Sequence, residues 1–136
     1  MRFTLEKEDK LKSRKLIEQL FSEGDRVKSF PFHMVFLPIN HKNNTTLQVG
    51  FSVPKRNIKL AVDRNRIKRI MREAYRKNKN LFSEGLTEKF IFMIVYTARK
   101  EMKYVEMELG MQKIAVKFQA KVIEERNKNN FDLNSK

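Results

Sequence analysis

Apolar residues near the N-terminus recur at helical spacing and predict the first element. This stretch begins at Ser13, a residue type that often caps the N-terminus of a helix, and ends at Gly24. Glycine suits the left-handed position that commonly follows a helix, so we expect Gly24 to adopt it. The stretch contains one apolar stripe, formed by Leu16, Ile17, Leu20 and Phe21. The pattern therefore predicts a helix over residues 13–24 with a single buried face.

Extended spacing follows and predicts two strands. In residues 32–37, Phe32, Met34 and Phe36 alternate with His33, Val35 and Leu37, so this strand is apolar on both faces. Residues 47–53 alternate between large apolar side chains and small or polar ones, which is typical of a strand with one covered face. The polar segment between them, residues 40–44, predicts a hairpin loop. Residues 26–29 allow a third short strand.

The helical period returns at Ala61 and predicts a helix that ends near Lys77. Its core stripe consists of Ile67, Ile70, Met71 and Ala74, at positions i, i+3, i+4 and i+7. After a polar break that contains Gly85, residues 90–96 are short, apolar and rich in β-formers, as in a buried strand.

A last long helix is predicted from Tyr104. Its buried stripe consists of Tyr104, Met107, Met111, Ile114, Ala115, Phe118 and Val122. Gly110 within it lowers helix stability by ~1 kcal/mol relative to alanine.

The order of these elements predicts an α+β fold in which helices cover a small sheet. At 136 residues, with 40% hydrophobic residues and 11 phenylalanines, the chain is expected to form one domain over residues 1–126. Residues 127–136 are polar and are expected to form a disordered tail.

The net charge of +14 indicates a polyanionic partner, either nucleic acid or an anionic membrane surface. The longest apolar run, residues 90–96, is far shorter than the ~20 residues that span a bilayer. The first residues lack the apolar run of a secretion signal, and the chain has no cysteine, so we expect a cytoplasmic protein.

The charge is densest over residues 55–79, which hold eleven lysines and arginines against Asp63 and Glu73 alone. Arginine can clamp phosphate oxygens with two donors, and an amide such as that of Asn65 can read a base edge or a 2′-hydroxyl. Asp63 is placed either to cap the helix or to orient an arginine. A merely solvated helix face is the alternative, but such faces usually mix charges of both signs. The predicted RNA-binding residues are Lys55, Arg56, Arg64, Asn65, Arg66, Lys68, Arg69, Arg72 and Arg76.

No constellation of residues predicts catalysis or metal binding by the protein. The two histidines, His33 and His41, have no partner at ligand spacing, and no glycine-rich phosphate loop or nucleophile elbow occurs. The second apolar face of residues 32–37 instead predicts a cleft lined by Phe21, His33 and Val35, in which single-stranded bases could stack. The alternative is that these aromatic side chains simply belong to the core.

Four segments together resemble the protein component of bacterial ribonuclease P. The most specific are VGFSVPKR (residues 49–56) and AVDRNRIKRIMREAYR (residues 61–76). Supporting matches are KLKSRKLIEQLFSEG (residues 10–24) and TARK (residues 97–100). The resemblance extends over roughly residues 10–122.

This resemblance implies a ribosomal-protein-like fold with about four strands in a mixed sheet and three helices. It also implies a left-handed crossover that places the Arg64–Asn65–Arg66 helix between two parallel strands. A large RNA subunit, paired one to one with the protein, would cleave precursor tRNA with Mg²⁺, and the protein would bind no cofactor itself. The 5′ leader would lie in a cleft formed by Ile17, Phe21, Phe32 and Val35.

Two positions depart from the family pattern. Lys59 replaces a common glycine before the basic helix, and Ile17 replaces a usual aromatic residue on the first helix. The rival interpretation is a structural ribosomal-type protein or an RNA chaperone without a dedicated substrate, and a membrane-surface protein comes third. Only a ribonuclease P subunit is expected to have a leader cleft in addition to the basic helix.

Overall fold

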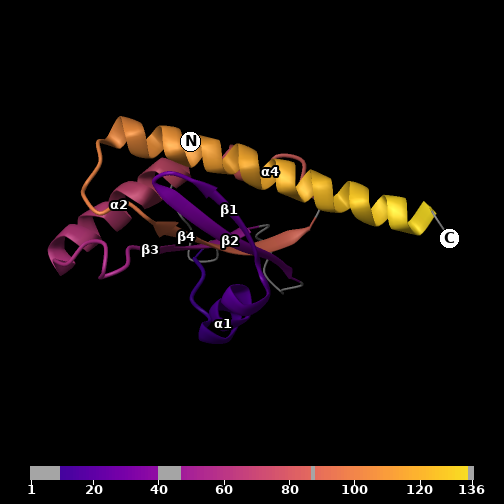
Figure 1. Cartoon of the computed structure of the whole chain (residues 1–136), viewed down its shortest axis with the longest axis horizontal. Helices are drawn as coiled ribbons and strands as arrows, with labels where there is room; N and C mark the ends of the chain where they lie inside the picture. Colours follow the sequence, from indigo (N-terminus) through magenta and orange to yellow (C-terminus); the bar gives the residue numbers. More distant parts are fainter. Residues whose placement is uncertain (1–9, 40–46, 87, 135–136) are drawn as a thin grey trace.

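The computed structural model describes residues 10–39, 47–86 and 88–134, with the main chain alone for residues 126–134. Apart from one short additional helix, the helices and strands follow the predicted order along this part of the chain (Figure 1). The elements are α1 (Arg14–Glu23), β1 (Asp25–Ser29), β2 (Phe32–Ile39), β3 (Leu47–Ser52), α2 (Ala61–Lys77), α3 (Lys79–Ser83), β4 (Lys89–Tyr96) and α4 (Tyr104–Asn134). The short strand expected at residues 26–29 is confirmed as β1.

The four strands form one mixed sheet in the order β1-β2-β4-β3. Strand β2 is antiparallel to β1 and β4, whereas β3 is parallel to β4. The connection from β3 through α2 to β4 therefore joins two parallel neighbours, and its left-handed sense stays a prediction.

The predicted hairpin between β2 and β3 is wrong, because β4 lies between these strands. Residues 40–44 themselves fall outside the described residues. Strand β4 is apolar at nearly every position, so both of its faces must be covered, and in a central place helices cover them, α2 and α4 on one side and α1 on the other. Alternation within β2 and β3 alone could not indicate that a later strand would separate them.

The sheet buries apolar side chains on both faces, as the pattern of β2 predicted. On one face, Phe32, Met34 and Phe36 pack with side chains of α2 and α4. On the other face, Val35 packs with Leu20 of α1. Figure 1 shows the long α4 along one side of the sheet and α1 on the opposite side. Residues 10–12 also reach the second face, where the Leu11 amide donates to Val49 O at 3.0 Å.

Helix α3 was not predicted, and its residues were assigned to a polar break. A five-residue helix is too short to show a helical period, but it carries Phe82, which is fully buried. The Phe82 ring stacks on Phe92 of β4 with centroids 5.6 Å apart. Gln119 Nε2 of α4 donates to the carbonyls of Leu81, Phe82 and Glu84, at 3.2, 2.8 and 3.0 Å, which fixes the end of α3.

Helix α1 begins as predicted but ends differently. The Ser13 hydroxyl accepts a hydrogen bond from the Leu16 amide at 3.3 Å. Gly24 follows the helix with φ −73° and ψ 154°, so the expected left-handed conformation is wrong. Glycine is needed there because of close approach instead. A Cβ atom at residue 24 would lie 2.5 Å from Leu20 O and 2.9 Å from Phe36 O.

The main chain of residues 127–134 continues α4, where the sequence predicted a disordered tail. Neither glycine nor proline occurs after Gly110, so no residue type that commonly breaks a helix interrupts this stretch. Figure 1 shows the helix extending well beyond the sheet.

Gly110 provides a test of this packing, because helix propensity and tertiary contact predict opposite signs. Propensity alone would make Gly110→Ala stabilising by ~1 kcal/mol. In the structure, a Cβ at residue 110 would lie 2.7 Å from Pro31 Cδ and 3.2 Å from Phe30 O. We expect Gly110→Ala to lower the free energy of unfolding by about 1–3 kcal/mol in urea titrations. Lys113→Ala, on the exposed side of α4, serves as the control and should be nearly neutral; a stabilised Gly110→Ala protein would contradict the packing.

Candidate nucleic-acid interface

Helix α2 presents a long cationic surface because its apolar stripe is held in the core. Ile67, Met71, Ala74 and Tyr75 are each at most 1% exposed, and Ile70 lies half-buried at the edge of the stripe. The core stripe predicted from the sequence is therefore confirmed, with Tyr75 added to it. The remaining circumference of α2 faces outward.

Four of the predicted RNA-binding residues on α2 keep their polar groups available. Within the described part of the chain, the side chains of Asn65, Lys68, Arg69 and Arg72 form no hydrogen bond or ion pair. Lys55 and Arg56 are exposed in the turn that precedes α2. At ~100° per residue, Asn65, Lys68 and Arg72 share one side of the helix, and Arg69 lies next to them.

Arg64 is committed to the protein itself. Its Nη1 atom donates to Ile58 O at 3.0 Å and to Lys59 O at 2.7 Å. These bonds hold the segment that leads from β3 into α2, at the position where Lys59 replaces the glycine of the family pattern. Arg64 therefore stabilises this turn and also contributes a positive charge to the surface of α2.

Arg66 is held by two carboxylates on the other side of α2. It contacts Asp63 Oδ1 at 2.6 Å and Glu101 Oε1 at 2.5 Å. The hydrogen bond and charge of Glu101, followed by the charge of Asp63, raise the pKa of Arg66. Asp63 therefore orients an arginine and does not cap the helix, whose N-cap is Leu60. This ion pair with the segment before α4 could not be seen in the sequence, since 35 residues separate Arg66 from Glu101.

Arg76 is only half exposed at the C-terminal end of α2. Its Nη2 lies 3.7 Å from Glu73 Oε1, and its buried Nε has no hydrogen-bond partner in the described part of the chain. Lys77 lies over the ring of Tyr104, with Nζ 5.0 Å from the centroid. The last turn of α2 is thus tied to α4.

A groove of about 260 Å³ runs between residues 10–12, β3 and α2. Its cationic side chains are Lys10, Lys12 and Arg72, and no carboxylate lines it. Phe51 and Leu11 supply its apolar surface. The sequence analysis missed Lys10 and Lys12, because only the pairing of Lys10 with Val49 brings them beside α2.

The four residues predicted to form a leader cleft are not brought together. Phe32 and Val35 lie on opposite faces of β2, since their positions differ by an odd number, and both are buried. A cleft lined by both side chains is therefore wrong. Ile17 is half-buried, whereas Phe21 is 40% exposed at the end of α1. Phe21 is the member of the set that is clearly accessible to a ligand.

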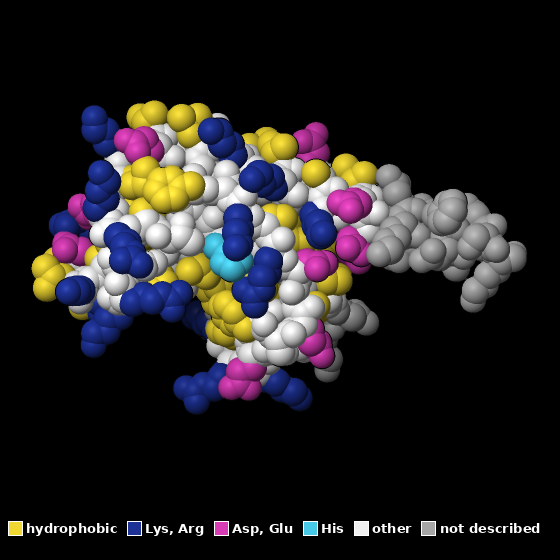
Figure 2. Space-filling model, in the orientation of Figure 1, with side chains coloured by type: hydrophobic (Ala, Val, Ile, Leu, Met, Phe, Trp, Pro, Cys, Tyr) yellow, Lys and Arg dark blue, Asp and Glu magenta, His cyan; other side chains and the backbone are white. Residues whose placement is uncertain are grey.

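His33 lies on the α1 side of the sheet between basic neighbours. His33 of β2 lies opposite Lys28 of the neighbouring strand β1, and Arg26 lies two residues before Lys28 on the same face of β1. Partial burial, followed by the charges of Arg26 and Lys28, lowers the pKa of His33. Its Nε2 atom is buried without a partner in the described part of the chain. Figure 2 shows Lys and Arg side chains gathered over the visible face of the molecule, with apolar side chains between them.

Acidic and metal-ligating side chains are scattered by comparison. Among residues 10–39, 47–86 and 88–134, no group of three or more His, Cys, Asp or Glu residues could hold a metal ion. Over the same residues, no helix has the length and apolar character needed to cross a bilayer. A basic helix beside a cationic groove defines the class of the protein as a nucleic-acid-binding α+β domain.

Comparison with known proteins identifies the family. The family model for ribonuclease P matches residues 5–119, so this chain belongs to the ribonuclease P protein family. The ribonuclease P protein component of Porphyromonas gingivalis (strain ATCC 33277) is 33% identical over 125 residues, covering 88% of this chain and 90% of the relative. That of Chlorobaculum tepidum is 37% identical over 78 residues, covering 55% of this chain and 51% of the relative.

Solved structures agree on the fold. The RNase P protein of Staphylococcus aureus matches with a TM-score of 0.60 at 22% identity, covering 82% of this chain and 94% of that protein. The RNase P protein from Thermotoga maritima gives a TM-score of 0.62 at 19% identity, with coverage of 78% and 94%. The α+β class and the mixed four-stranded sheet inferred from the sequence are thus confirmed, with one helix more than expected.

The environment of His33 makes a prediction about stability and pH. Because folding lowers its pKa below the ordinary 6.5, the unfolded chain binds a proton more readily than the folded one. The free energy of unfolding should therefore fall as the pH drops below about 6.5. His33→Gln should lose part of this dependence when urea titrations at pH 7.5 and pH 5 are compared. His41 is present in both proteins, so equal pH dependence in the two would contradict the assigned environment.

Proposed function

We propose that this chain is the RNA-binding protein subunit of ribonuclease P, which removes the 5′ leader of precursor tRNA. The observation that carries the proposal is a row of polar side chains on α2 that form no hydrogen bond or ion pair with the described residues, namely Asn65, Lys68, Arg69 and Arg72. Arg72 also lines the groove beside Lys10 and Lys12. In this proposal one protein binds one RNA subunit.

The two parts of this surface suit two kinds of RNA. The outer face of α2 is convex and rich in arginine, which favours the phosphates of a folded RNA. The groove combines Lys10, Lys12 and Arg72 with the apolar side chains of Leu11 and Phe51. Alternating cationic and apolar contacts suit a single strand, whose phosphates and unstacked bases are both exposed. Arg72 belongs to both parts and would join the leader to the RNA subunit.

Cleavage in this proposal belongs to the RNA subunit and its Mg²⁺ ions. Phosphate oxygens are preferred ligands of Mg²⁺, and a folded RNA supplies many of them. The protein contributes by neutralising phosphates where RNA subunit and leader come together. Less Mg²⁺ is then needed to offset their repulsion.

The available arginines of α2 can be tested by the salt dependence of RNA binding. Each cation that neutralises a phosphate contributes about 0.7–0.9 to the slope of log affinity against log salt. We expect Arg69→Ala and Arg72→Ala each to weaken binding to a ribonuclease P RNA and to flatten the slope by roughly one unit. Lys113→Ala on α4 is the charge-matched control and should change the slope little. Unfolding of either arginine variant with an unchanged slope would contradict the proposed face.

A further leader contact is placed at Phe21, which is exposed on α1 outside the groove, and it separates a leader-binding subunit from an RNA chaperone without a dedicated substrate. Loss of one stacked base costs about 1–3 kcal/mol, so Phe21→Ala should weaken binding of precursor tRNA to the holoenzyme by about 5- to 150-fold. Mature tRNA, which lacks the leader, should bind unchanged. Phe30→Ala is the matched control, because Phe30 is also exposed but lies in the β1–β2 turn beside α4.

Thermal unfolding of the same variants is measured beside the two affinities, so that a loss of stability can be told from a loss of RNA contact. If Phe21 were simply a core residue, its truncation would reduce stability by about 3–5 kcal/mol and weaken both RNAs together. Equal losses for precursor and mature tRNA at unchanged stability would refute a leader contact at Phe21.

A further inference from the structure

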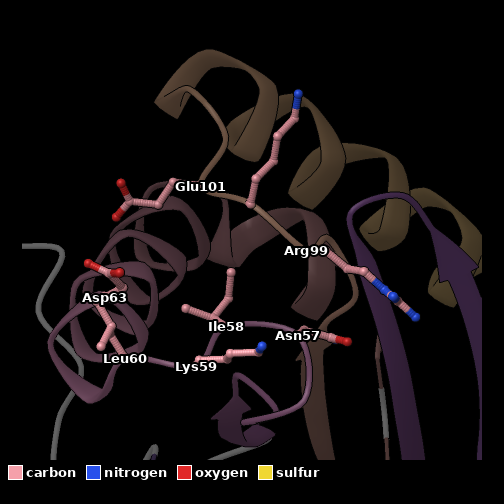
Figure 3. A pocket seen from close by; sticks show the side chains of 8 residues that line it. Asn57, Ile58, Lys59, Leu60, Asp63, Arg99 and Glu101 are labelled. Atoms are coloured by element: carbon pink, nitrogen blue, oxygen red, sulfur yellow. The ribbon is translucent and has the colours of Figure 1, made fainter.

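A second pocket, of about 340 Å³, lies on the side of α2 away from the groove (Figure 3). It is lined by residues 57–60 and Asp63 on one side and by residues 99–101 on the other. These two segments leave the carboxyl ends of the parallel strands β3 and β4. At ~100° per residue, Arg66 beside this pocket and Arg72 in the groove are separated by about 120° around the helix axis.

The walls of the pocket are held in place by hydrogen bonds between the two segments. Asn57 Nδ2 donates to Tyr96 O at 3.1 Å. Burial raises the pKa of Tyr96 to about 12, so the hydroxyl keeps its proton and donates to Lys100 O at 2.5 Å. Arg66 joins Asp63 on one wall to Glu101 on the other. The pocket is therefore largely preformed before any ligand arrives.

The charges available in this pocket are positive. Its two carboxylates, Asp63 and Glu101, both pair with Arg66. Its cations are Lys59, Arg99 and Lys100, whose side chains form no hydrogen bond or ion pair with any described residue. An anion placed here would meet three cations, whereas Asp63 and Glu101 share the single charge of Arg66 and together keep one net negative charge. Figure 3 shows the side chains of Lys59 and Arg99 extending from different segments, so they could contact successive parts of one ligand.

The pocket also offers an oriented acceptor and an apolar surface. Because Asn57 Nδ2 is bound to Tyr96 O, the amide is fixed, and its Oδ1 accepts no hydrogen bond from any described residue. Ile58 is buried at the base of the pocket, and Leu60 is 64% exposed at its rim. A volume of about 340 Å³ lies at the lower end of the range of small-ligand pockets, ~300–1,000 Å³. Phosphate alone would not need the apolar surface or the acceptor.

We propose that this pocket binds a single unpaired nucleotide of the RNA subunit, with the phosphates on its two sides at Lys59 and Arg99. A base amino group or a 2′-hydroxyl would donate to Asn57 Oδ1, and the base or sugar would cover Leu60. Unpaired nucleotides are the usual targets of specific RNA recognition, because their edges and faces are exposed. The inference rests on the proposed function and adds a second RNA contact, so that RNA would contact α2 on two of its sides.

The test uses the full chain and a ribonuclease P RNA subunit. The double variant Lys59→Ala/Arg99→Ala removes two cations that form no hydrogen bond or ion pair with the described residues. The control Lys113→Ala/Lys121→Ala removes the same charge from α4. We expect the pocket variant to bind the RNA more weakly and to flatten the salt slope by roughly 0.7–0.9 per cation. The control should retain most of the slope, and thermal unfolding should be unchanged in both.

A second readout separates a nucleotide site from a general anion site. Titration of the ¹⁵N-labelled protein with uridine 5′-monophosphate should shift the Asn57 side-chain amide and the backbone amides of residues 58–60. Inorganic phosphate should shift the backbone amides near Lys59 and Arg99 but leave the Asn57 side chain in place. The nucleotide shifts should vanish in the pocket variant.

Three results would overturn the inference. One is equal salt slopes for the pocket variant and its control, and another is identical shifts with nucleotide and phosphate. The third is an unshifted Asn57 amide at saturating nucleotide. RNA binding by Arg69→Ala is measured in parallel, because Arg69 tests the proposed function and does not line the pocket. If Arg69→Ala weakens RNA binding while the pocket variant does not, only the pocket is refuted.

Discussion

The structure depends on the need to bury both faces of β4. Phe92 and Ile94 project into the core with α2 and α4, whereas Ile91 and Met93 project toward α1. A strand with two apolar faces is stable only between other strands and between two layers of helices. Its neighbour on one side is β3, which runs parallel to it, and a parallel connection requires a crossover. Helix α2 is that crossover, so the most basic segment of the chain is fixed against the sheet by Ile67, Met71 and Tyr75.

Electrostatics then divide the cations of α2 by the task that each can perform. Arg64 donates to the carbonyls of residues 58–59, and Arg66 pairs with two carboxylates. Both arginines therefore fix the segments at the start of the helix. Lys68, Arg69 and Arg72 have no such partners in the described part of the chain and remain available to phosphate. A net charge of +14 would repel itself in a compact domain, and a bound polyanion removes that repulsion.

The sequence predicted the elements whose period is long enough to be recognised. Helix α2 and its core stripe, the strands β2, β3 and β4, and the start of α1 at Ser13 all follow from local patterns. The arrangement of the strands did not, because the pairing of β4 with β2 joins residues fifty or more positions apart. The short α3 was not predicted for a different reason, since it has one buried residue, Phe82, and a single residue cannot show a helical period.

The same distinction applies to the candidate site. Its residue types were predictable, since arginines, lysines and an asparagine opposite an apolar stripe must face outward. The partners of those residues were not predictable, because Glu101 and Lys10 reach α2 only through the tertiary fold. The leader cleft failed at Phe32 and Val35, for which the period-2 rule already excludes a shared face.

The most direct test of this account is the Mg²⁺ dependence of precursor tRNA cleavage by a ribonuclease P RNA, measured with and without the protein under single-turnover conditions. The account predicts that the RNA with the protein cleaves at a lower Mg²⁺ concentration than the RNA alone, and that the protein alone does not cleave at any concentration. Cleavage by RNA-free protein, or an unchanged Mg²⁺ requirement when the protein is bound, would contradict it.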